Sequence, residues 1–297
     1  MIVDVHSHLW WYPDHIGEEW ASEALASKLV KLERSGGEAY AGALDLHSYD
    51  SRPEQHWEAS VGADKVVVFG LQARAVGVWV PNELIAEYAA AHPEKIVGWA
   101  SVDPNDPGCV PQLEHAIDTL NLRGLKLGPV YQHFDPEDER HWELFELCSD
   151  RNVPVIWHQG TTFPSKARLK WGAPLQLEGI AMRFPDLRMI IAHLGHPWEE
   201  DTVALIRKCP NLYADISACH YRPWRYWMSL INAIEYGVAD KLLFASDFPS
   251  GTIENVLNGL RRVNDVVAGS GLPTVDLDTQ ESIIHENWKG AFPEWIP

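Results

Sequence analysis

Eight short apolar segments recur along the chain, and this repeat constrains the fold more than any other feature. Each segment is rich in Val, Ile and Leu, lacks polar alternation and is bounded by turn residues. This composition is typical of strands that are buried on both faces, as in a parallel sheet. The segments span residues 2–6, 65–70, 95–102, 124–128, 153–158, 188–193, 211–217 and 241–246.

Helical patterns separate these segments. They span 82–95, 110–121, 136–152, 174–186, 198–211, 225–237 and 253–269. Asn82 is expected to cap the first of them and Gly269 to end the last. Strand and helix alternating in this way over 297 residues predict an α/β protein with a (β/α)8 TIM barrel in a single domain, 1–297. One long insertion, about 9–64, follows the first strand and contains a helical pattern at 18–36.

Composition and charge exclude several classes of protein. A formal net charge of −18 argues against nucleic acid or an anionic membrane surface as a partner. No segment approaches the roughly 20 apolar residues of a membrane span, and the N-terminus lacks a signal peptide pattern. The four cysteines have no paired spacing, so we expect reduced core thiols in a cytoplasmic protein. They are Cys109, Cys148, Cys209 and Cys219.

Histidine and aspartate side chains stand at the ends of four predicted strands. His6 and His8 lie two residues apart and therefore face the same side of a strand. His158 ends the fifth segment, His193 the sixth, and Asp247 follows the eighth. In a TIM barrel these ends meet at one face. Imidazole and carboxylate together bind a divalent ion such as zinc, and a catalytic site leaves one position open.

We therefore expect one divalent metal, zinc or alternatively manganese, bound by four of these side chains. The expected ligands are His6, His8, His158 and Asp247. His193 is then expected to act as a general acid or base, since the pKa of an imidazole lies near neutrality. His196, three residues later, is interpreted as structural because it lies past the strand end.

Five motifs together resemble the amidohydrolase superfamily: VDVHSH, GLKLGP, VIWHQGTT, IIAHLGHPW and LLFASDFP. The resemblance spans residues 2 to about 250 and is greatest to family 2, the branch with aminocarboxymuconate-semialdehyde decarboxylase. It implies one metal at the positions of His6, His8, His158 and Asp247, with His193 as the catalytic acid or base. The branch contains decarboxylases, hydratases, lactonases and other hydrolases, so the resemblance leaves the reaction open.

Lys126 in GLKLGP leaves two interpretations. In other amidohydrolase branches a carboxylated lysine of the fourth strand bridges two metals, and the histidine matching His193 is then also a ligand. The flanking sequence is closer to the branch with one metal. In that case Lys126 is a pocket cation that pairs with Asp247 or with a substrate carboxylate.

Further side chains near the strand ends are candidates for binding substrate. The expected substrate-binding residues are Trp10, Lys126, Tyr131, Arg222 and Arg225. The two arginines could hold a carboxylate through paired hydrogen bonds. Asp215 is expected to bond a ligand histidine, to touch substrate or to form a structural ion pair. His133 is expected to line the pocket together with Tyr131.

These residues predict an enzyme that acts on a small, carboxylated molecule. We expect a metal-dependent hydrolase in which activated water, deprotonated by Asp247 or His193, attacks an ester, lactone or amide carbonyl. The alternative is a metal-dependent non-oxidative decarboxylase of an aromatic or unsaturated acid. A barrel that only binds is disfavoured because no strand-end ligand is missing. A homodimer is expected because two-fold symmetric assemblies are common.

Overall fold

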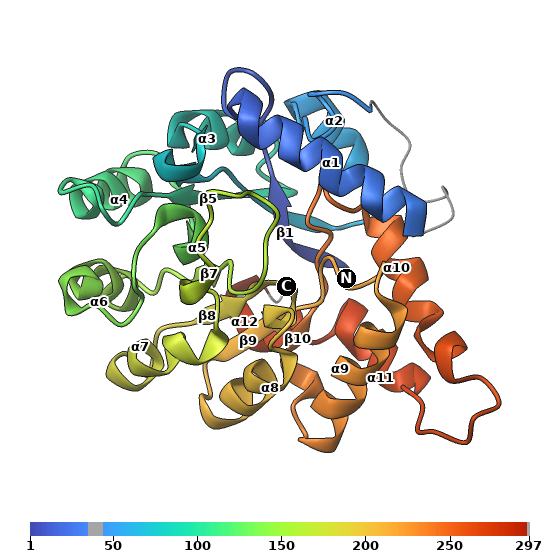
Figure 1. Cartoon of the computed structure of the whole chain (residues 1–297). Coiled ribbons are helices and arrows are strands. Elements are labelled where there is room, and N and C mark those ends of the chain that lie inside the picture. The colour runs from blue at the N-terminus through green and yellow to red at the C-terminus, as the bar shows by residue number, and fades with distance from the viewer. Residues whose placement is uncertain (35–43, 296–297) are drawn as a thin grey trace.

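Eight parallel strands form one closed barrel in the computed structural model, which describes residues 1–34 and 44–295. The strands are β1 (Val3–His8), β2 (Lys65–Phe69), β5 (Ile96–Ser101), β6 (Leu125–Leu127), β7 (Val155–Trp157), β8 (Met189–Ile191), β9 (Leu212–Asp215) and β10 (Leu242–Leu243), hydrogen-bonded in that order. The backbone N–H of Val5 donates to the carbonyl of Phe244 at 3.2 Å and closes the ring. The predicted TIM barrel is confirmed (Figure 1).

Helices surround the strands, and the segment between β1 and β2 contributes two of them (Figure 1). The α-helices are α1 (Glu18–Arg34), α2 (Pro53–Ala59), α3 (Asn82–Ala91), α4 (Cys109–Asp118), α5 (Pro129–Gln132), α6 (Trp142–Asp150), α7 (Glu178–Arg183), α8 (Glu199–Lys208), α9 (Pro223–Glu235), α10 (Ile253–Arg261), α11 (Leu277–His285) and α12 (Trp288–Ala291). A short antiparallel pair, β3 (Gln72–Ala73) and β4 (Val78–Trp79), follows β2. Within the described ranges, none of the helices is long and apolar enough to cross a membrane.

The barrel interior is filled by side chains from most of its strands. Val5, Phe69 and Trp99 are fully buried there, in one cluster with Trp288 and Phe292 near the C-terminus. Burying a large apolar side chain contributes about 1.5–3 kcal/mol, so this packing is a major part of the stability. A second, larger cluster lies between strands and helices.

Several predicted helix boundaries differ from those in the structure, three of them in ways that matter for the packing. The segment 253–269 divides into α10 and a 3₁₀ turn, Val263–Val267, which Gly269 follows at φ +74°. The segment 174–186 begins as a 3₁₀ turn before α7. Asn82 does not cap α3; its side chain accepts from the Ser101 N–H at 2.9 Å and donates to the Ser101 carbonyl at 3.0 Å. This pair ties α3 to the end of β5.

The side-chain alternation of β1 is interrupted just before the histidines. Its register with β2 shifts between Asp4 and Ser7. Val5 lies in the barrel interior. The imidazole ring of the next residue, His6, packs on the interior Phe69 with 5.1 Å between ring centroids. Ser7 instead donates to the Val67 carbonyl at 2.7 Å. An irregularity of this kind re-aims side chains at barrel rims, and here it turns the histidines toward the barrel axis.

Candidate active site

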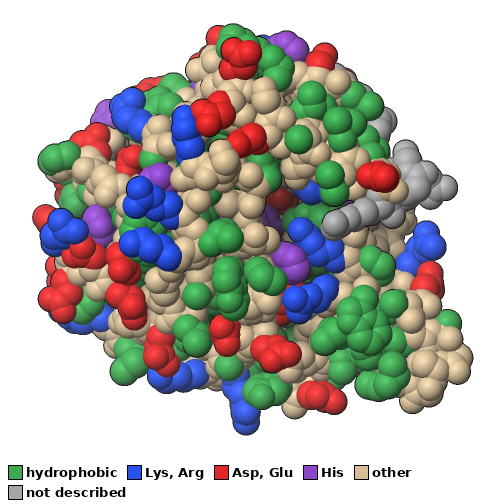
Figure 2. Space-filling view, viewed as in Figure 1, with side chains coloured by type: hydrophobic (Ala, Val, Ile, Leu, Met, Phe, Trp, Pro, Cys, Tyr) green, Lys and Arg blue, Asp and Glu red, His purple; other side chains and the backbone are tan. Residues whose placement is uncertain are grey.

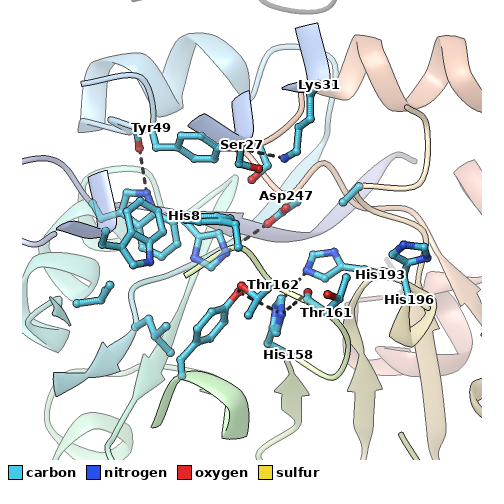
Figure 3. A pocket seen from close by; sticks show the side chains of 18 of the residues that line it. His8, Ser27, Lys31, Tyr49, His158, Thr161, Thr162, His193, His196 and Asp247 are labelled. Atoms are coloured by element: carbon cyan, nitrogen blue, oxygen red, sulfur yellow. Dashed lines mark hydrogen bonds and ion pairs between the residues drawn. The ribbon is translucent and has the colours of Figure 1, made fainter. Parts of the chain in front are cut away.

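A cavity of about 210 Å³ lies at the carboxyl ends of the strands (Figure 3). Its volume is below the roughly 300–1,000 Å³ of pockets for drug-sized ligands, which suits a small substrate. Four of the five expected substrate-binding residues line it: Trp10, Lys126, Tyr131 and Arg222. So do His8, His158, His193, His196 and Asp247.

The remaining expected contacts lie elsewhere. Arg225 is outside the cavity lining, and its guanidinium lies 3.6 Å from the buried carboxylate of Glu199. The same carboxylate bonds the Nδ1 atom of His196 at 2.6 Å. His196, which was interpreted as structural, also lines the cavity. His133 bonds the Lys166 carbonyl at 2.7 Å and does not line the cavity.

Three of the four predicted metal ligands meet at the base of this cavity: His8 and Asp247 line it, and His6 is fully buried behind them. The Nε2 atoms of His6 and His8 are 3.2 Å apart. Asp247 Oδ1 lies 3.3 Å from the first and 3.4 Å from the second. Burial holds the pKa of both imidazoles well below the usual range, so neutral rings with available lone pairs are favoured. Closely packed nitrogen and carboxylate atoms of this kind fit a divalent cation such as zinc or manganese.

His158 and His193 lie next to this group. His193 was predicted as the acid or base, yet it is the one grouped with His6 and Asp247. His6, His193 and Asp247 offer ligand atoms that all lie within 4.8 Å of one another. His158 instead bonds Tyr131 through Nε2 at 3.1 Å and His193 through Nδ1 at 3.3 Å. The structure therefore leaves two assignments of the fourth ligand, the predicted His158 and the nearer His193.

Two of these residues have unusual backbone conformations. His193 and Asp247 follow strands β8 and β10 with φ of +56° and +58°, in the left-handed region. Non-glycine residues rarely adopt this conformation, and strained residues of this kind cluster at active sites. A hydrogen bond from the Asp247 N–H to the His6 carbonyl, 2.8 Å, helps to hold the turn. Nothing in the local sequence predicts these angles.

Asp215, at the end of β9, accepts hydrogen bonds from both His6 and His193. One carboxylate oxygen accepts from His6 Nδ1 at 2.8 Å. The other accepts from the backbone N–H groups of His193 at 2.9 Å and Ser217 at 3.0 Å. A proton held on Nδ1 of His6 leaves the Nε2 lone pair free for a metal. The structure thus shows the hydrogen bond expected for Asp215, to the predicted metal ligand His6.

Asp215→Asn is expected to weaken metal affinity about 10–100-fold while leaving the chain folded, because an amide can still accept from the two backbone groups. The neutral amide of asparagine no longer favours the tautomer of His6 that has its proton on Nδ1. Competition with a chelator of known affinity measures the change. Asp240→Asn, an exposed aspartate, is the control. Equal metal affinity in both variants would rule out this role for Asp215.

Lys126 approaches the same centre from β6. The side chain is buried, and Nζ lies 3.4 Å from His6 Nε2 and 4.7 Å from the centre of the Phe69 ring. Burial lowers the pKa of this amine to about 8, against the attraction of Asp247 and Asp215. At neutral pH it is largely a cation that faces the floor of the cavity.

Several cavity residues were not predicted, and most come from the insertion or the loop 159–173. Ser27 and Lys31 of α1, Trp20, Tyr49 and Phe163 all line the cavity. Hydrogen bonds fasten α1 to that loop: Ser165 N–H donates to Glu23 at 3.0 Å, and Lys166 pairs with Glu19. In the sequence of the insertion, the aromatic residues were the feature that could have indicated a pocket.

Asp4, which was also not predicted, is buried between β1 and the β10 end. It accepts from the Ser246 N–H at 2.9 Å and the Ser246 hydroxyl at 2.5 Å. Burial raises the pKa of this carboxyl to about 7, the largest effect on it. The folded protein therefore retains a proton here, at a pH where the unfolded chain has lost it.

Stability of the metal-free protein is expected to fall as pH rises because of Asp4. Between the unfolded pKa near 4 and the folded pKa of about 7, the unfolded state binds fewer protons, so the free energy of unfolding decreases and then levels off. Asp4→Asn removes this contribution, about 3 kcal/mol between about pH 4.5 and about pH 8. Denaturant titrations of both proteins at the two pH values test this. Parallel pH dependences would contradict it.

The match to known proteins agrees with this geometry. The family model described as amidohydrolase matches residues 3–287, nearly the whole chain. The chain belongs to the amidohydrolase family. The family-level resemblance seen in the sequence is thereby confirmed. The search of curated proteins found no match to this amidohydrolase.

Solved structures similar to this amidohydrolase share its barrel at low sequence identity. An uncharacterized TIM-barrel protein from Bordetella bronchiseptica is 20% identical with a TM-score of 0.74, covering 99% of this chain and 98% of that one. A probable 2-pyrone-4,6-dicarboxylic acid hydrolase from Acinetobacter baumannii, with citric acid bound, is 15% identical (TM-score 0.67; 98% and 99% covered). A dihydroxybenzoic acid decarboxylase from a Polaromonas species, with manganese and an inhibitor, is 18% identical (0.63; 100% and 98%). At these identities the likeness shows the fold alone.

Proposed function

We propose that this amidohydrolase is a metal-dependent hydrolase of small carboxylated esters, lactones or amides. One observation supports it most: nitrogen and oxygen atoms of His6, His8 and Asp247 lie 3.2–3.4 Å from one another at the base of the strand-end cavity. A divalent ion held by these residues lowers the pKa of water and polarises a substrate oxygen. His158 is the proposed fourth ligand.

The side chains of the site have separate tasks in this proposal. Ser217 accepts a hydrogen bond from Nδ1 of His193 at 2.7 Å, which leaves the Nε2 lone pair to take a proton from the attacking water. That proton then passes to the leaving oxygen or nitrogen as the bond to the carbonyl carbon breaks. Lys126 holds an anionic oxygen of the substrate close to the His6 ring.

Non-oxidative decarboxylation is the second candidate, and the cavity walls favour it specifically. Trp10 stacks on His8 with 4.0 Å between ring centroids, and Trp20 and Phe163 continue the aromatic wall. A flat aromatic or unsaturated acid fits between such rings. In this reaction His193 first accepts a proton from water at Nε2; the bond from ring carbon to carboxylate then breaks, CO2 leaves, and His193 passes that proton to the carbon. The manganese-containing decarboxylase of the same fold supports this alternative and supports manganese beside zinc.

Metal content and product identity test the proposal together. Elemental analysis of the purified protein should give about one zinc or manganese ion per chain. The loaded protein is then assayed for hydrolysis of aromatic lactones, esters and amides, and for CO2 release from hydroxybenzoic acids. About two ions per chain would move Lys126 and His193 into the ligand set. No metal, before or after adding zinc and manganese, would overturn the proposal.

Two expectations from the sequence stay proposals of the same kind. We propose a homodimer and a cytoplasmic location, on the general frequency of two-fold assemblies and on four buried, unpaired cysteines. Sedimentation of the purified protein tests the first.

A further inference from the structure

A buried histidine of the insertion lies behind the candidate metal ligands. Figure 2 shows Lys, Arg and His side chains around the hollow near the centre of one face of the molecule, where a ligand can reach them. His56 of α2 differs from these: its exposed fraction is 1%, and it is not among the described residues that line the strand-end cavity. This ring therefore cannot touch a substrate, and any role in the reaction must act through other residues.

Three hydrogen bonds connect His56 to the barrel, and their directions follow from the donors available. The Ser7 hydroxyl has one proton, which it donates to the Val67 carbonyl at 2.7 Å. The Ser7 oxygen therefore accepts from Nε2 of His56, also at 2.7 Å. Nδ1 of the neutral ring is then an acceptor, and the Tyr88 hydroxyl of α3 donates to it at 2.9 Å. These bonds form one continuous chain from α3 through α2 to β1 and β2.

Burial favours a single protonation state for this chain of hydrogen bonds. It lowers the pKa of His56 to about 3 and raises the pKa of Tyr88 above its usual range. At neutral pH the imidazole is therefore neutral and the phenol keeps its proton. Each group then has one fixed role as donor or acceptor, so the chain holds Ser7 in one position.

His56 also contacts both segments that hold the predicted ligands. Ser7 lies between the two histidines of β1, at the point where the register of this strand shifts. Phe248 directly follows Asp247, and its ring meets that of His56 edge to face with 6.0 Å between centroids. The Phe248 carbonyl accepts from the His8 N–H at 2.8 Å, which pairs the two segments beside this ring. A change at position 56 therefore reaches both sides of the ligand set.

We propose that His56 is a positioning residue for the candidate metal centre. Its bond to Ser7 fixes the end of β1 and so sets the distance of His6 and His8 from Asp247. This inference rests on the proposed function, because it requires that these side chains bind a divalent ion. Residues that orient metal ligands from behind typically change metal affinity about 10–100-fold when they are replaced.

Two substitutions at position 56 separate the hydrogen bond from the packing. Phenylalanine keeps a planar ring without a donor, whereas the amide of glutamine can place an N–H near the position of Nε2. His56→Phe is expected to weaken binding of zinc or manganese about 10–100-fold, measured by competition with a chelator. His56→Gln is expected to stay within about three-fold of the unaltered protein, because it keeps a donor for Ser7.

His92→Phe is the matched control. His92 also lies between α2 and α3, but its ring stacks on Trp57 of α2 with 4.1 Å between centroids. This variant is expected to bind metal as the unaltered protein does. Should His56→Phe fail to fold, Tyr88→Phe removes a single oxygen from the chain of hydrogen bonds and is expected to weaken metal binding at least about three-fold.

Denaturant unfolding of each metal-free variant separates a loss of stability from a loss of affinity. A purely structural role would lower the free energy of unfolding in His56→Phe and leave the metal affinity of the folded protein unchanged, which would overturn the inference. An equal loss of affinity in His56→Gln or in His92→Phe would also overturn it, and so would unchanged affinity in Tyr88→Phe. If the unaltered protein binds neither metal, the proposed function fails as well, whereas equal affinity in all variants overturns this inference alone.

Discussion

Asp247→Asn is expected to reduce turnover at least about a thousand-fold and to lower the metal content of the purified protein well below one ion per chain. The Asp247 carboxylate contacts both histidines of β1, at 3.3 and 3.4 Å. An amide has no negative charge and a single acceptor oxygen, so it cannot hold the same cation or accept a proton.

Asparagine is the informative replacement because it preserves the backbone. Asp247 has φ of +58°, a conformation that Asn tolerates better than most residues. The bond from its N–H to the His6 carbonyl is also retained. Elemental analysis and a steady-state assay of the variant, with Asp240→Asn as control, measure the effect. Wild-type turnover in Asp247→Asn would exclude this carboxylate from the reaction.

The strands and most of the site could be predicted because both follow from local patterns. A strand buried on two faces must be apolar throughout, so the eight segments stand out between amphipathic helices. In parallel strands the polar residue that follows each apolar segment must reach the same rim. This is why His6, His8, His158, His193 and Asp247, distant in sequence, surround one centre.

The parts that could not be predicted depend on contacts between distant segments. The register shift in β1 is set by its pairing with β2, and it lets His6 pack on the interior Phe69 although the preceding Val5 also lies inside the barrel. The position of α1 over the cavity depends on bonds from Glu19 and Glu23 to the loop 159–173. The same role was predicted for Arg222 and Arg225, yet the turn before α9, in which the Arg222 N–H donates to the Cys219 carbonyl, places only Arg222 in the cavity lining.

His193→Asn is expected to keep about one metal ion per chain and to lose about 100- to 10,000-fold in turnover, the range for removing a general acid or base. Burial holds the pKa of His193 well below its usual range, and Ser217 holds the Nδ1 proton. The ring is therefore neutral at neutral pH with its Nε2 lone pair toward the centre. Asparagine also suits the left-handed backbone at this position.

His158→Asn is the partner variant that decides between the two ligand assignments. If His158 is the fourth ligand, this change empties the site and abolishes turnover, whereas His193→Asn leaves the metal in place. The reverse pattern would identify the compact group of His6, His193 and Asp247 as the true ligand set. His158, bonded to the Tyr131 hydroxyl at 3.1 Å, would then remain as the proton carrier. Metal analysis of both variants thus separates the ligand from the acid or base, because each imidazole can fill only one of these roles at a time.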